Sequence, residues 1–239
     1  MKRIVIGDIH GLFGVFQDIY NLEKPNSVII VGDYFDSFTI DPIVQKCGWE
    51  DLMRLRDNHK GGEFIMIAGN HDIHYLSNFY EKYSGYNNYT ATFASDFVKG
   101  ALDKNILQMC YIDEINKTIY SHAGVTQTWF NKWCKKLKDI NKLPIDAFKF
   151  VGTNIYGDDP RNSPIWVRPN SLISDPYYDK ERYMWNQIFG HTHKSKVTIV
   201  AQPGPKTILY NVDCMPHEYL VETLDDNKKL ITREIKTYE

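Results

Sequence analysis

The sequence predicts an α/β fold, and three observations lead to that prediction. Short runs of apolar, β-branched residues recur along the chain, segments of helical character fall between them, and five of the runs pass directly into polar residues. Apolar runs of this kind suit strands that are buried on both faces. With 239 residues, 43% of them hydrophobic, the chain can bury a sizeable core, and we expect a single domain over residues 1–239.

The five predicted strands share one feature, a polar segment directly after the apolar run. They are residues 3–6, 27–31, 63–68, 118–120 and 187–189. Two helices, residues 15–22 and 49–57, are predicted between the early strands. In open sheets layered with helices, ligands bind beyond the carboxyl ends of the strands. The polar segments therefore mark the region in which to look for a site.

A third helix is predicted over residues 128–141. Trp129, Trp133 and Leu137 recur there every four residues, which favours one buried helix face and a role in the core. The remaining positions include Lys135, Lys136 and Lys138, which we interpret as a solvated helix face.

Two regions lack a clear strand or helix period. Residues 84–96 are polar and rich in tyrosine, and we expect a loop or a short cap there. Within residues 125–186, the part from 152 to 186 is rich in Gly, Pro, Asp and aromatic residues. Loops on a rigid scaffold commonly shape binding sites. Both regions, 84–96 and 125–186, are therefore predicted to be insertions that shape the substrate site.

Composition excludes several classes of protein. A formal charge of −2 predicts no strong nonspecific attraction to nucleic acid or to anionic membranes. The four cysteines are scattered without a C-x-x-C pair, which argues against a structural zinc site and a disulfide framework. No run of about 18 apolar residues occurs, and the first apolar run is too short for a signal peptide. We therefore expect a soluble, cytoplasmic protein.

The polar residues that follow the strands form the most informative set in the sequence. Five of the eight histidines belong to it, together with carboxylates and an amide. The set is Asp8, His10, Asp33, Asp36, Asn70, His71, Asp72, His122, His191 and His193. Any one segment could be a turn or a helix cap. Their repeated position after strands instead indicates one shared site.

Carboxylate, imidazole and amide ligands without thiolates suit Mn²⁺, Zn²⁺ or iron, whereas an all-oxygen Ca²⁺ cage would not need histidines. There are too many candidate ligands for one ion. We therefore predict two divalent transition-metal ions, with manganese as the first choice and zinc or iron as alternatives. Two such ions, about 3.5–4 Å apart, can clamp a phosphate and generate a hydroxide nucleophile.

Five motifs carry a resemblance to a known family. GDIHG at 7–11, GDYFD at 32–36, GNHD at 69–72, SHAG at 121–124 and GHTH at 190–193 together resemble the signature of calcineurin-like metallophosphoesterases. The resemblance covers the chain from residue 7 to residue 193. It implies a sandwich of two mixed β-sheets flanked by helices (αββα), with a dinuclear site at the strand ends.

The resemblance also implies roles for individual residues. The ligands of the first metal would be Asp8, His10 and His193. The ligands of the second metal would be Asn70, His122 and His191, with Asn70 also close to the substrate. Asp33 would bridge the two ions. A metal-bridging hydroxide would attack phosphorus in line, while His71, oriented by Asp36, would act as a non-ligand general acid or transition-state stabiliser.

Other polar residues near the motifs keep less specific interpretations. Asp72 is either an acceptor behind a ligand histidine or a cap of the following helix, rather than a metal ligand. His59, His74 and His217 match no position of the family pattern, and we interpret them as structural. The glycines before the ligands are expected to permit sharp turns.

The chain departs from the protein serine/threonine phosphatase branch, which reads Gly-Asp-x-x-Asp-Arg-Gly at the second motif. Ser37 follows Asp36 here, so that phosphate-gripping arginine is missing. His193, which the branch often lacks, is present. The segment SPIWVRP at 163–169 looks closer to small bacterial and phage phosphatases, in which a Trp-x-Arg segment supplies a phosphate-binding arginine. Arg168 is the candidate clamp, ahead of Arg161 and Arg182.

The sequence thus predicts a metal-dependent phosphoric ester hydrolase acting on a phosphorylated substrate, such as a phosphoprotein or a nucleotide. The first interpretation is a phosphomonoesterase similar to protein serine/threonine phosphatases. One alternative is a nucleotide-directed hydrolase, either a phosphodiesterase or a dinucleoside polyphosphatase. The other is a non-catalytic binding scaffold with this fold. A scaffold would be expected to lose His71 or several ligands, and here every such position is filled.

Overall fold

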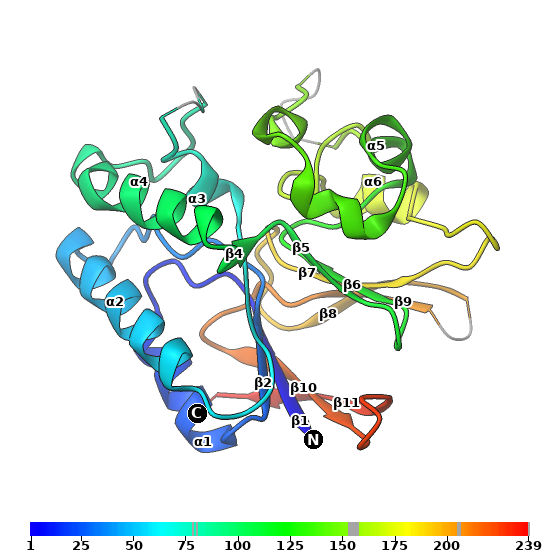
Figure 1. The fold of residues 1–239 in the computed structure, drawn as a ribbon, viewed down its shortest axis with the longest axis horizontal. Coiled ribbons are helices and arrows are strands. Elements are labelled where there is room, and N and C mark those ends of the chain that lie inside the picture. Colours follow the sequence, from blue (N-terminus) through cyan, green and yellow to red (C-terminus); the bar gives the residue numbers. More distant parts are fainter. Residues whose placement is uncertain (78, 80, 153–157, 205–206, 239) are drawn as a thin grey trace.

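The computed structural model describes residues 1–77, 79, 81–152, 158–204 and 207–238. It has two mixed sheets that pack against each other, with helices on their outer faces (Figure 1). The six-stranded sheet has the order β11 (Leu230–Thr237), β10 (Glu218–Leu224), β1 (Lys2–Ile6), β2 (Ser27–Ile30), β3 (Phe64–Ile67), β4 (Leu107–Gln108). The five-stranded sheet has the order β5 (Cys110–Asp113), β6 (Thr118–Ser121), β7 (Asn186–Phe189), β9 (Thr207–Asn211), β8 (Thr198–Gly204).

The helices form two groups. Helices α1 (Phe13–Glu23), α2 (Pro42–Asn58), α3 (Asn70–Ile73) and α4 (Asn88–Asp103) lie together beside the six-stranded sheet (Figure 1). Helices α5 (Gln127–Trp133) and α6 (Pro169–Ser174), with the 3₁₀ turns η1 (Leu137–Lys142) and η2 (Ile145–Phe148), belong to the five-stranded sheet. The predicted sandwich of two mixed sheets flanked by helices is therefore confirmed.

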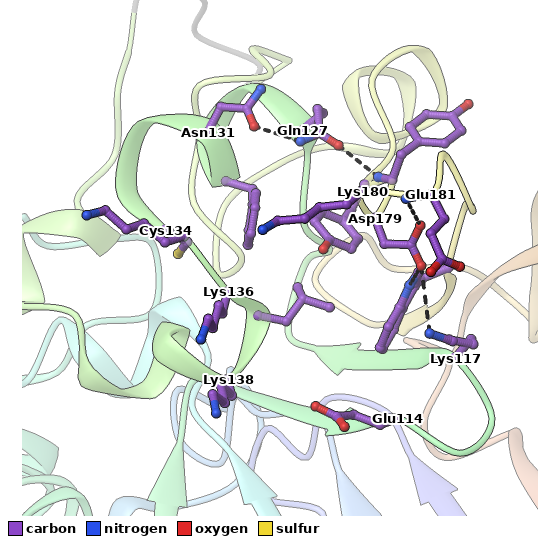
Figure 2. A pocket seen from close by; sticks show the side chains of 16 residues that line it. Glu114, Lys117, Gln127, Asn131, Cys134, Lys136, Lys138, Asp179, Lys180 and Glu181 are labelled. Atoms are coloured by element: carbon purple, nitrogen blue, oxygen red, sulfur yellow. Dashed lines mark hydrogen bonds and ion pairs between the residues drawn. The ribbon is translucent and has the colours of Figure 1, made fainter.

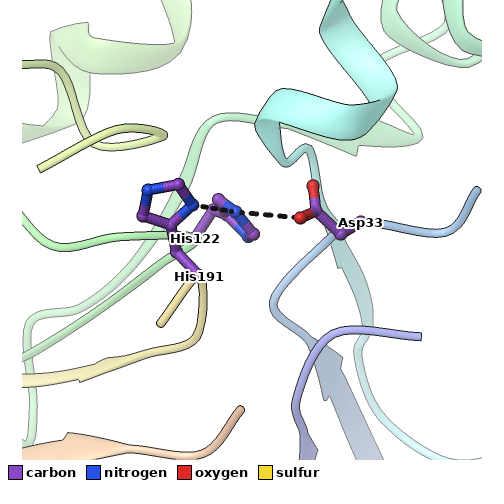
Figure 3. A group of neighbouring side chains, drawn as sticks. All are labelled: Asp33, His122 and His191. Atoms are coloured by element: carbon purple, nitrogen blue, oxygen red, sulfur yellow. Dashed lines mark hydrogen bonds and ion pairs between the residues drawn. The ribbon is translucent and has the colours of Figure 1, made fainter. Parts of the chain in front are cut away.

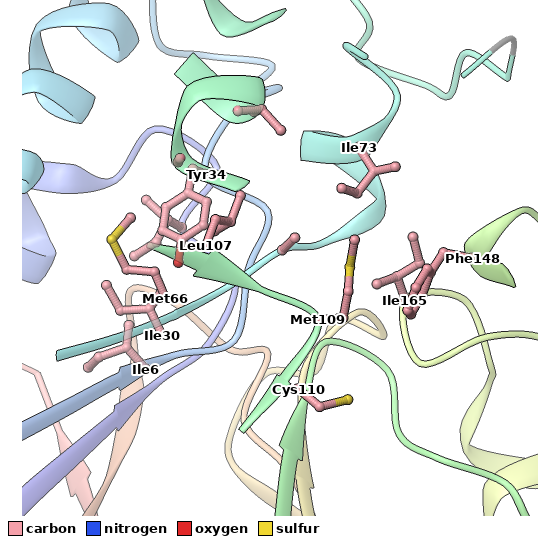
Figure 4. Close-up of a cluster of buried hydrophobic side chains, with 14 of the residues drawn as sticks. Ile6, Ile30, Tyr34, Met66, Ile73, Leu107, Met109, Cys110, Phe148 and Ile165 are labelled. Atoms are coloured by element: carbon pink, nitrogen blue, oxygen red, sulfur yellow. The ribbon is translucent and has the colours of Figure 1, made fainter. Parts of the chain in front are cut away.

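All five predicted strands are present, as β1, β2, β3, β6 and β7, and nearly every one of their residues is buried or half-buried. Alternate side chains serve two cores because a strand points successive residues to opposite faces. Val5 and Ile29 pack between the sheets against Ile188. Ile6 and Ile30 point to the other side, into the larger core beneath the helices (Figure 4).

The predicted helices at 15–22 and 49–57 are the inner parts of α1 and α2. Both begin earlier than the sequence pattern indicates. Helix α2 starts at Pro42, which occupies a first-turn position where its missing N–H costs nothing. Asp41 caps this helix, since its side chain accepts a hydrogen bond from the backbone N–H of Ile43 at 2.8 Å.

The prediction of a loop or short cap at 84–96 is wrong from Asn88 onward, where the 16-residue helix α4 begins. The side chain of Asn87 caps it by accepting hydrogen bonds from the backbone N–H groups of Tyr89 and Thr90. Phe93 and Val98 lie on its buried face. Half of that apolar face lies beyond residue 96, so the polar start of the helix hides its period in the window 84–96.

The predicted helix at 128–141 is also wrong in its second half, because α5 ends at Trp133 and Cys134 adopts an extended conformation. The chain then turns into η1, and Leu137 and Ile140 enter the core that holds Trp129. Asn141 explains the change of path. Its side chain accepts hydrogen bonds from the backbone N–H groups of residues 109 and 110 and donates to the carbonyl of residue 110. These tertiary contacts outweigh the local helix period.

Lys135, Lys136 and Lys138 are exposed, as predicted, although they do not belong to a continuous helix. They lie along a cavity of about 730 Å³ beneath α5 and η1, with Lys117 on the opposite side (Figure 2). This cavity shares no lining residue with the site described below. The four cysteines, Cys47, Cys110, Cys134 and Cys214, are free. None of the described helices combines the length and apolar composition needed to cross a membrane.

Candidate dinuclear metal centre

The sheet register brings the polar segments of the predicted site together. β1, β2 and β3 are parallel neighbours, and so are β6 and β7, so their carboxyl ends lie along shared edges. The segments that follow these strands surround a cavity of about 190 Å³. Its lining comprises Asp8, His10, Asp33, Asn70, His71, Tyr83, Ser84, Trp166, Arg168, His191, His193 and Asp213. His122 lies fully buried beside it.

The backbone around the cavity is held in unusual conformations. His10, Asp33, Asp36 and His191 all have positive φ, between 40° and 66°. Non-glycine residues adopt this region rarely, and strain of this kind concentrates at functional sites. The expectation of sharp turns at the glycines holds for Gly32, with a φ of 120°.

Two other glycines provide space instead of a turn. A Cβ atom on Gly69 would lie 2.0 Å from Oδ1 of Asp33, and one on Gly190 would lie 1.9 Å from Oδ1 of Asp8. Neither distance leaves room for a carbon atom. These glycines are therefore required because the two carboxylates pack directly against the backbone.

One group of three donor atoms consists of Oδ1 of Asn70, Nε2 of His122 and Nδ1 of His191. The two distances from Asn70 to the histidines are both 2.9 Å, and the two histidine nitrogens are 3.2 Å apart. Nδ1 of His122 donates to the carbonyl of Val31 at 2.9 Å, so its Nε2 carries a lone pair toward the group. With the proton of His191 on its other nitrogen, these three atoms would all offer lone pairs to one cation.

A second group consists of Asp8, His10 and Asp33, whose ligand atoms lie within 4.8 Å of one another. Nδ1 of His10 is 2.9 Å from the carbonyl of Phe35, to which it donates, which leaves Nε2 facing Asp33 at 3.6 Å. Asp33 also belongs to a group with His122 and His191, and its Oδ2 is 3.4 Å from Nε2 of His122 (Figure 3). Asp33 is therefore common to both groups.

The electrostatics of the cavity fit cations. Burial and the negative charges of Asp213 and Asp33 raise the pKa of Asp8 well above its ordinary value. Burial also lowers the pKa of His122 to about 4 and lowers that of His191. Neutral imidazoles are ready to bind a metal, and the repulsion among the buried carboxylates is what a bound cation would offset. The donor set, without thiolates, suits divalent ions of the manganese, zinc or iron type.

The side chain of His71 contacts Asp36 and not the two groups of candidate metal ligands. Its Nδ1 is 2.8 Å from Oδ2 of Asp36, and its backbone N–H donates to Oδ1 of Asp33 at 2.9 Å. Burial opposes protonation of His71, but the charges of Asp33 and Asp36 outweigh it, so the pKa of His71 is raised above its ordinary value. The imidazole lines the cavity and can carry a proton to a group bound there.

Asp72 caps α3 and anchors the Asp33 loop, which settles the two interpretations left open by the sequence in favour of the cap. Its carboxylate accepts hydrogen bonds from the backbone N–H groups of Gly69, Asp33 and Tyr34 at 2.8, 3.0 and 2.8 Å. It accepts no hydrogen bond from a histidine within the described part of the chain. Asp72 thereby links the second and third motifs.

Arg168 reaches the cavity, as the sequence predicts for a phosphate clamp. It is half-buried, and one guanidinium nitrogen, Nη1, donates to the carbonyl of His191 and to Oγ1 of Thr192, both at 3.1 Å. Burial lowers the pKa of Arg168 below its ordinary value, and the guanidinium still stays charged at neutral pH. Within the described part of the chain, only Nη1 of this guanidinium makes a hydrogen bond, so the other N–H groups can contact a ligand in the cavity.

The other two candidate arginines lie elsewhere. Arg161 is exposed and pairs with Asp159, its own neighbour, with Nε 2.9 Å from Oδ1. Arg182 is exposed in a turn with a φ of 59°. Neither lines the cavity.

His193 lines the cavity but stays apart from both donor groups. Its side chain is 70% exposed, and its nearest carboxylate is Asp213, with Nδ1 3.6 Å from Oδ1. The role of His193 as a ligand of the first metal remains a prediction. Asp213 was missed by the sequence reasoning, although it follows strand β9 just as the predicted ligands follow theirs.

Tyr83, Ser84 and Trp166 complete the cavity wall. Ser84 begins the region 84–96 that was predicted to shape the site, and Trp166 is the tryptophan of the Trp-x-Arg segment, whereas nothing in the sequence pattern marks Tyr83. His74 and Tyr75 contact the carboxylate of Asp36. Nε2 of His74 lies 2.8 Å from Oδ2, and the hydroxyl of Tyr75 donates to Oδ1. His59 and His217 lie away from the cavity, as a structural interpretation requires.

Comparison with known proteins agrees with this geometry. The family model described as calcineurin-like phosphoesterase matches residues 1–195. The chain belongs to the calcineurin-like phosphoesterase family. This family uses divalent metal ions, and the described residues include candidate ligand groups for them.

The individual relatives share little sequence identity with this chain. The symmetrical bis(5'-nucleosyl)-tetraphosphatases of Salmonella paratyphi A and Salmonella arizonae are each 25% identical over 174 residues, which are 68% of this chain and 57% of the relative. The chain thus spans a little over half the length of these relatives. Among solved structures, the phosphoesterase Yfce from E. coli matches with a TM-score of 0.39 and 12% identity, covering 98% of both chains. The purple acid phosphatase PPD1 from yellow lupin seeds matches with a TM-score of 0.42 and 11% identity, covering 99% of this chain and 53% of the other.

Proposed function

We propose that the protein is a phosphomonoesterase that uses two divalent metal ions, with manganese as the first candidate. The observation that carries the proposal is the pair of donor groups that share Asp33 in one small cavity with His71 and Arg168. In this assignment Asp8, His10 and His193 hold one ion, Asn70, His122 and His191 hold the other, and Asp33 bridges them. Bound ions would polarise the phosphoryl oxygens and activate the attacking water.

The protein's own residues then divide the remaining work. Arg168 binds a phosphoryl oxygen, because a guanidinium fork matches the geometry of a phosphate. The backbone carbonyls of Val31 and Phe35 accept hydrogen bonds from Nδ1 of His122 and of His10, respectively. These bonds fix the tautomers in which Nε2 is free to bind a metal. His71 delivers a proton to the leaving oxygen, and Asp36 orients its ring and stabilises its charged form.

The size of the cavity favours a monoester. A volume of about 190 Å³ suits a phosphoryl group and leaves the rest of the substrate outside. Drug-sized ligands occupy pockets of roughly 300–1,000 Å³. A protein side chain or another simple alcohol can then be the leaving group. This comparison supports the resemblance to protein phosphatases.

A second candidate function is the hydrolysis of a nucleotide anhydride or diester. The names of the tetraphosphatase relatives favour it. Tyr83 and Trp166 at the cavity wall, with ring centroids 4.3 Å apart, could contact a base. Activity on phosphopeptides, mononucleotides, dinucleoside polyphosphates and RNA ends, measured side by side, distinguishes the candidates.

Removal of metal is expected to abolish hydrolysis of p-nitrophenyl phosphate, and addition of Mn²⁺ is expected to restore it. The physical reason is that the buried carboxylates and neutral imidazoles of the site would act on the substrate only through bound cations. The measurement is the rate of the chelator-treated protein titrated with Mn²⁺, Zn²⁺ or Fe²⁺. No recovery with any of the three ions would refute the two-metal proposal.

Arg168→Ala is expected to weaken inhibition by inorganic phosphate about 10- to 100-fold, because a charge-assisted hydrogen bond contributes about 1.5–3 kcal/mol. The contacts of Arg168 with His191 and Thr192 hold it over the cavity. Arg182→Ala is the matched control, since Arg182 is exposed and does not line the cavity. The inhibition constant of each variant is measured with metals saturating. An inhibition constant unchanged in Arg168→Ala removes the clamp from the proposal.

A further inference from the structure

His74 is a buried histidine that the cavity does not use directly. It is the residue directly after α3, three residues after His71, and its side chain is 0% exposed. Nε2 lies 2.8 Å from Oδ2 of Asp36, the same carboxylate oxygen that Nδ1 of His71 contacts at 2.8 Å. Within the described part of the chain, Nε2 of His74 makes no aligned hydrogen bond, so its approach to Oδ2 of Asp36 is a close contact defined by distance. One carboxylate oxygen therefore serves two imidazoles.

The other ring nitrogen of His74 fixes the tautomer. Nδ1 accepts a hydrogen bond from the backbone N–H of Tyr83 at 3.3 Å. A nitrogen that accepts carries no proton, so the proton of the ring is on Nε2, where it faces Asp36. The ring itself is stacked against Tyr83, with centroids 5.4 Å apart and planes 19° from parallel. His74 is thus held from two sides and cannot turn its N–H away from Asp36.

Asp36 needs such a clamp. It is 0% exposed on its side chain and has a φ of 66°, so its backbone does not select the orientation of the carboxylate by ordinary preferences. Tyr75 donates to Oδ1, while His71 and His74 share Oδ2. Without His74, only Tyr75 would oppose rotation of the carboxylate away from His71.

We propose that His74 is a positioning residue for the reaction: it clamps the carboxylate of Asp36 and thereby holds the imidazole of His71 in the cavity. The inference rests on the proposed function, because it concerns the same acid. It goes beyond that function by giving a role to a histidine outside the metal ligands. His74 touches neither substrate nor metal in this role, and its effect passes through Asp36.

Two variants of His74 separate the clamp from a purely structural role. In His74→Gln, the side-chain amide can place an N–H near the position of Nε2 and keep the contact with Asp36. In His74→Asn, the shorter amide can still accept from the N–H of Tyr83 but does not reach Asp36. His59→Asn is the matched control, since both ring nitrogens of His59 have partners, Tyr20 and the carbonyl of Asn26, and the residue lies away from the cavity.

The measured quantities are kcat and KM for phenyl phosphate and p-nitrophenyl phosphate, with bound metal determined for each variant. His74→Asn is expected to lower kcat for phenyl phosphate about 10- to 100-fold, because the general acid is misplaced. The decrease is expected to be smaller for p-nitrophenyl phosphate, whose leaving group needs less protonation. KM and metal content stay unchanged. His74→Gln is expected to recover most of kcat, and His59→Asn to match the wild type.

Equal losses in His74→Gln and His74→Asn, or equal losses on the two substrates, would overturn the inference. So would a wild-type kcat in His74→Asn. If His74→Asn does not fold, His74→Met takes its place, because methionine matches glutamine in length and lacks the donor. An inactive wild-type protein with metals present would contradict the proposed function itself, whereas an active wild type with unaffected variants contradicts the role of His74 alone.

Discussion

Asp33→Asn is expected to abolish metal-dependent hydrolysis, with kcat lowered by about a thousandfold or more. Asp33 is the residue common to the two donor groups, and its side chain is 2% exposed. Asparagine keeps an oxygen for the N–H of His71 but loses the negative charge and the second donor oxygen. Loss of one metal's stabilisation costs several kcal/mol, and about 1.4 kcal/mol corresponds to each factor of ten in rate.

The direct measurement is the metal content of the purified variant, in ions per chain, beside the rate on p-nitrophenyl phosphate. Asp113→Asn is the control for loss of a buried carboxylate, because Asp113 pairs with Arg3 at 3.0 Å and does not line the cavity. It should keep the wild-type metal content. An Asp33→Asn protein that retains two ions and substantial activity would show that Asp33 does not bridge them.

The strands, and the gathering of most candidate ligands around one cavity, were predictable from sequence for one physical reason. A strand buried on both faces must be a run of apolar residues, and polar residues can start only where it leaves the sheet. Asp8 and Asp33 directly follow such runs after a single glycine or a Val-Gly pair. The parallel register then brings both exits to one edge. Residues that follow parallel strands in the sequence are therefore expected to lie close together in the structure.

Contacts between residues from distant loops are what the sequence did not reveal. Tyr83 and Trp166 meet at the cavity, with centroids 4.3 Å apart, but come from loops more than 80 residues apart, which no local period links. His74 was predicted to be structural because the motif ends at Asp72. Only the three-dimensional contact of its Nε2 with Asp36 distinguishes it from His59.

The loop prediction at 84–96 and the helix prediction at 128–141 were wrong for different reasons. At α4, polar residues dominate positions 84–96, because half of the apolar helix face lies beyond residue 96. At α5 the period was genuine, but Asn141 binds the backbone between β4 and β5 and redirects the chain. Periodicity predicts which residues are buried, here Trp129 and Leu137, more securely than it predicts a continuous helix.

His71→Asn is expected to lower kcat about 100- to 10,000-fold on phenyl phosphate and much less on p-nitrophenyl phosphate, the range that general acid catalysis contributes. Asparagine places its amide near the position of Nδ1, so contact with Asp36 can persist. It offers nothing in place of Nε2, and the proton for the leaving oxygen is lost. The backbone N–H of residue 71 still donates to Asp33, which preserves the metal site.

The pH profile provides a second measurement for His71→Asn. Since the pKa of His71 is raised above its ordinary value of 6.5, the protonated, active acid persists above that pH and is lost as pH rises further. The alkaline decrease of kcat in the wild type should therefore disappear in the variant. His122→Asn is the contrasting variant, because His122 belongs to a donor group: it should lose metal and slow both substrates equally. If His71→Asn slowed both substrates equally as well, His71 would be acting as a ligand or a binding group rather than as the acid.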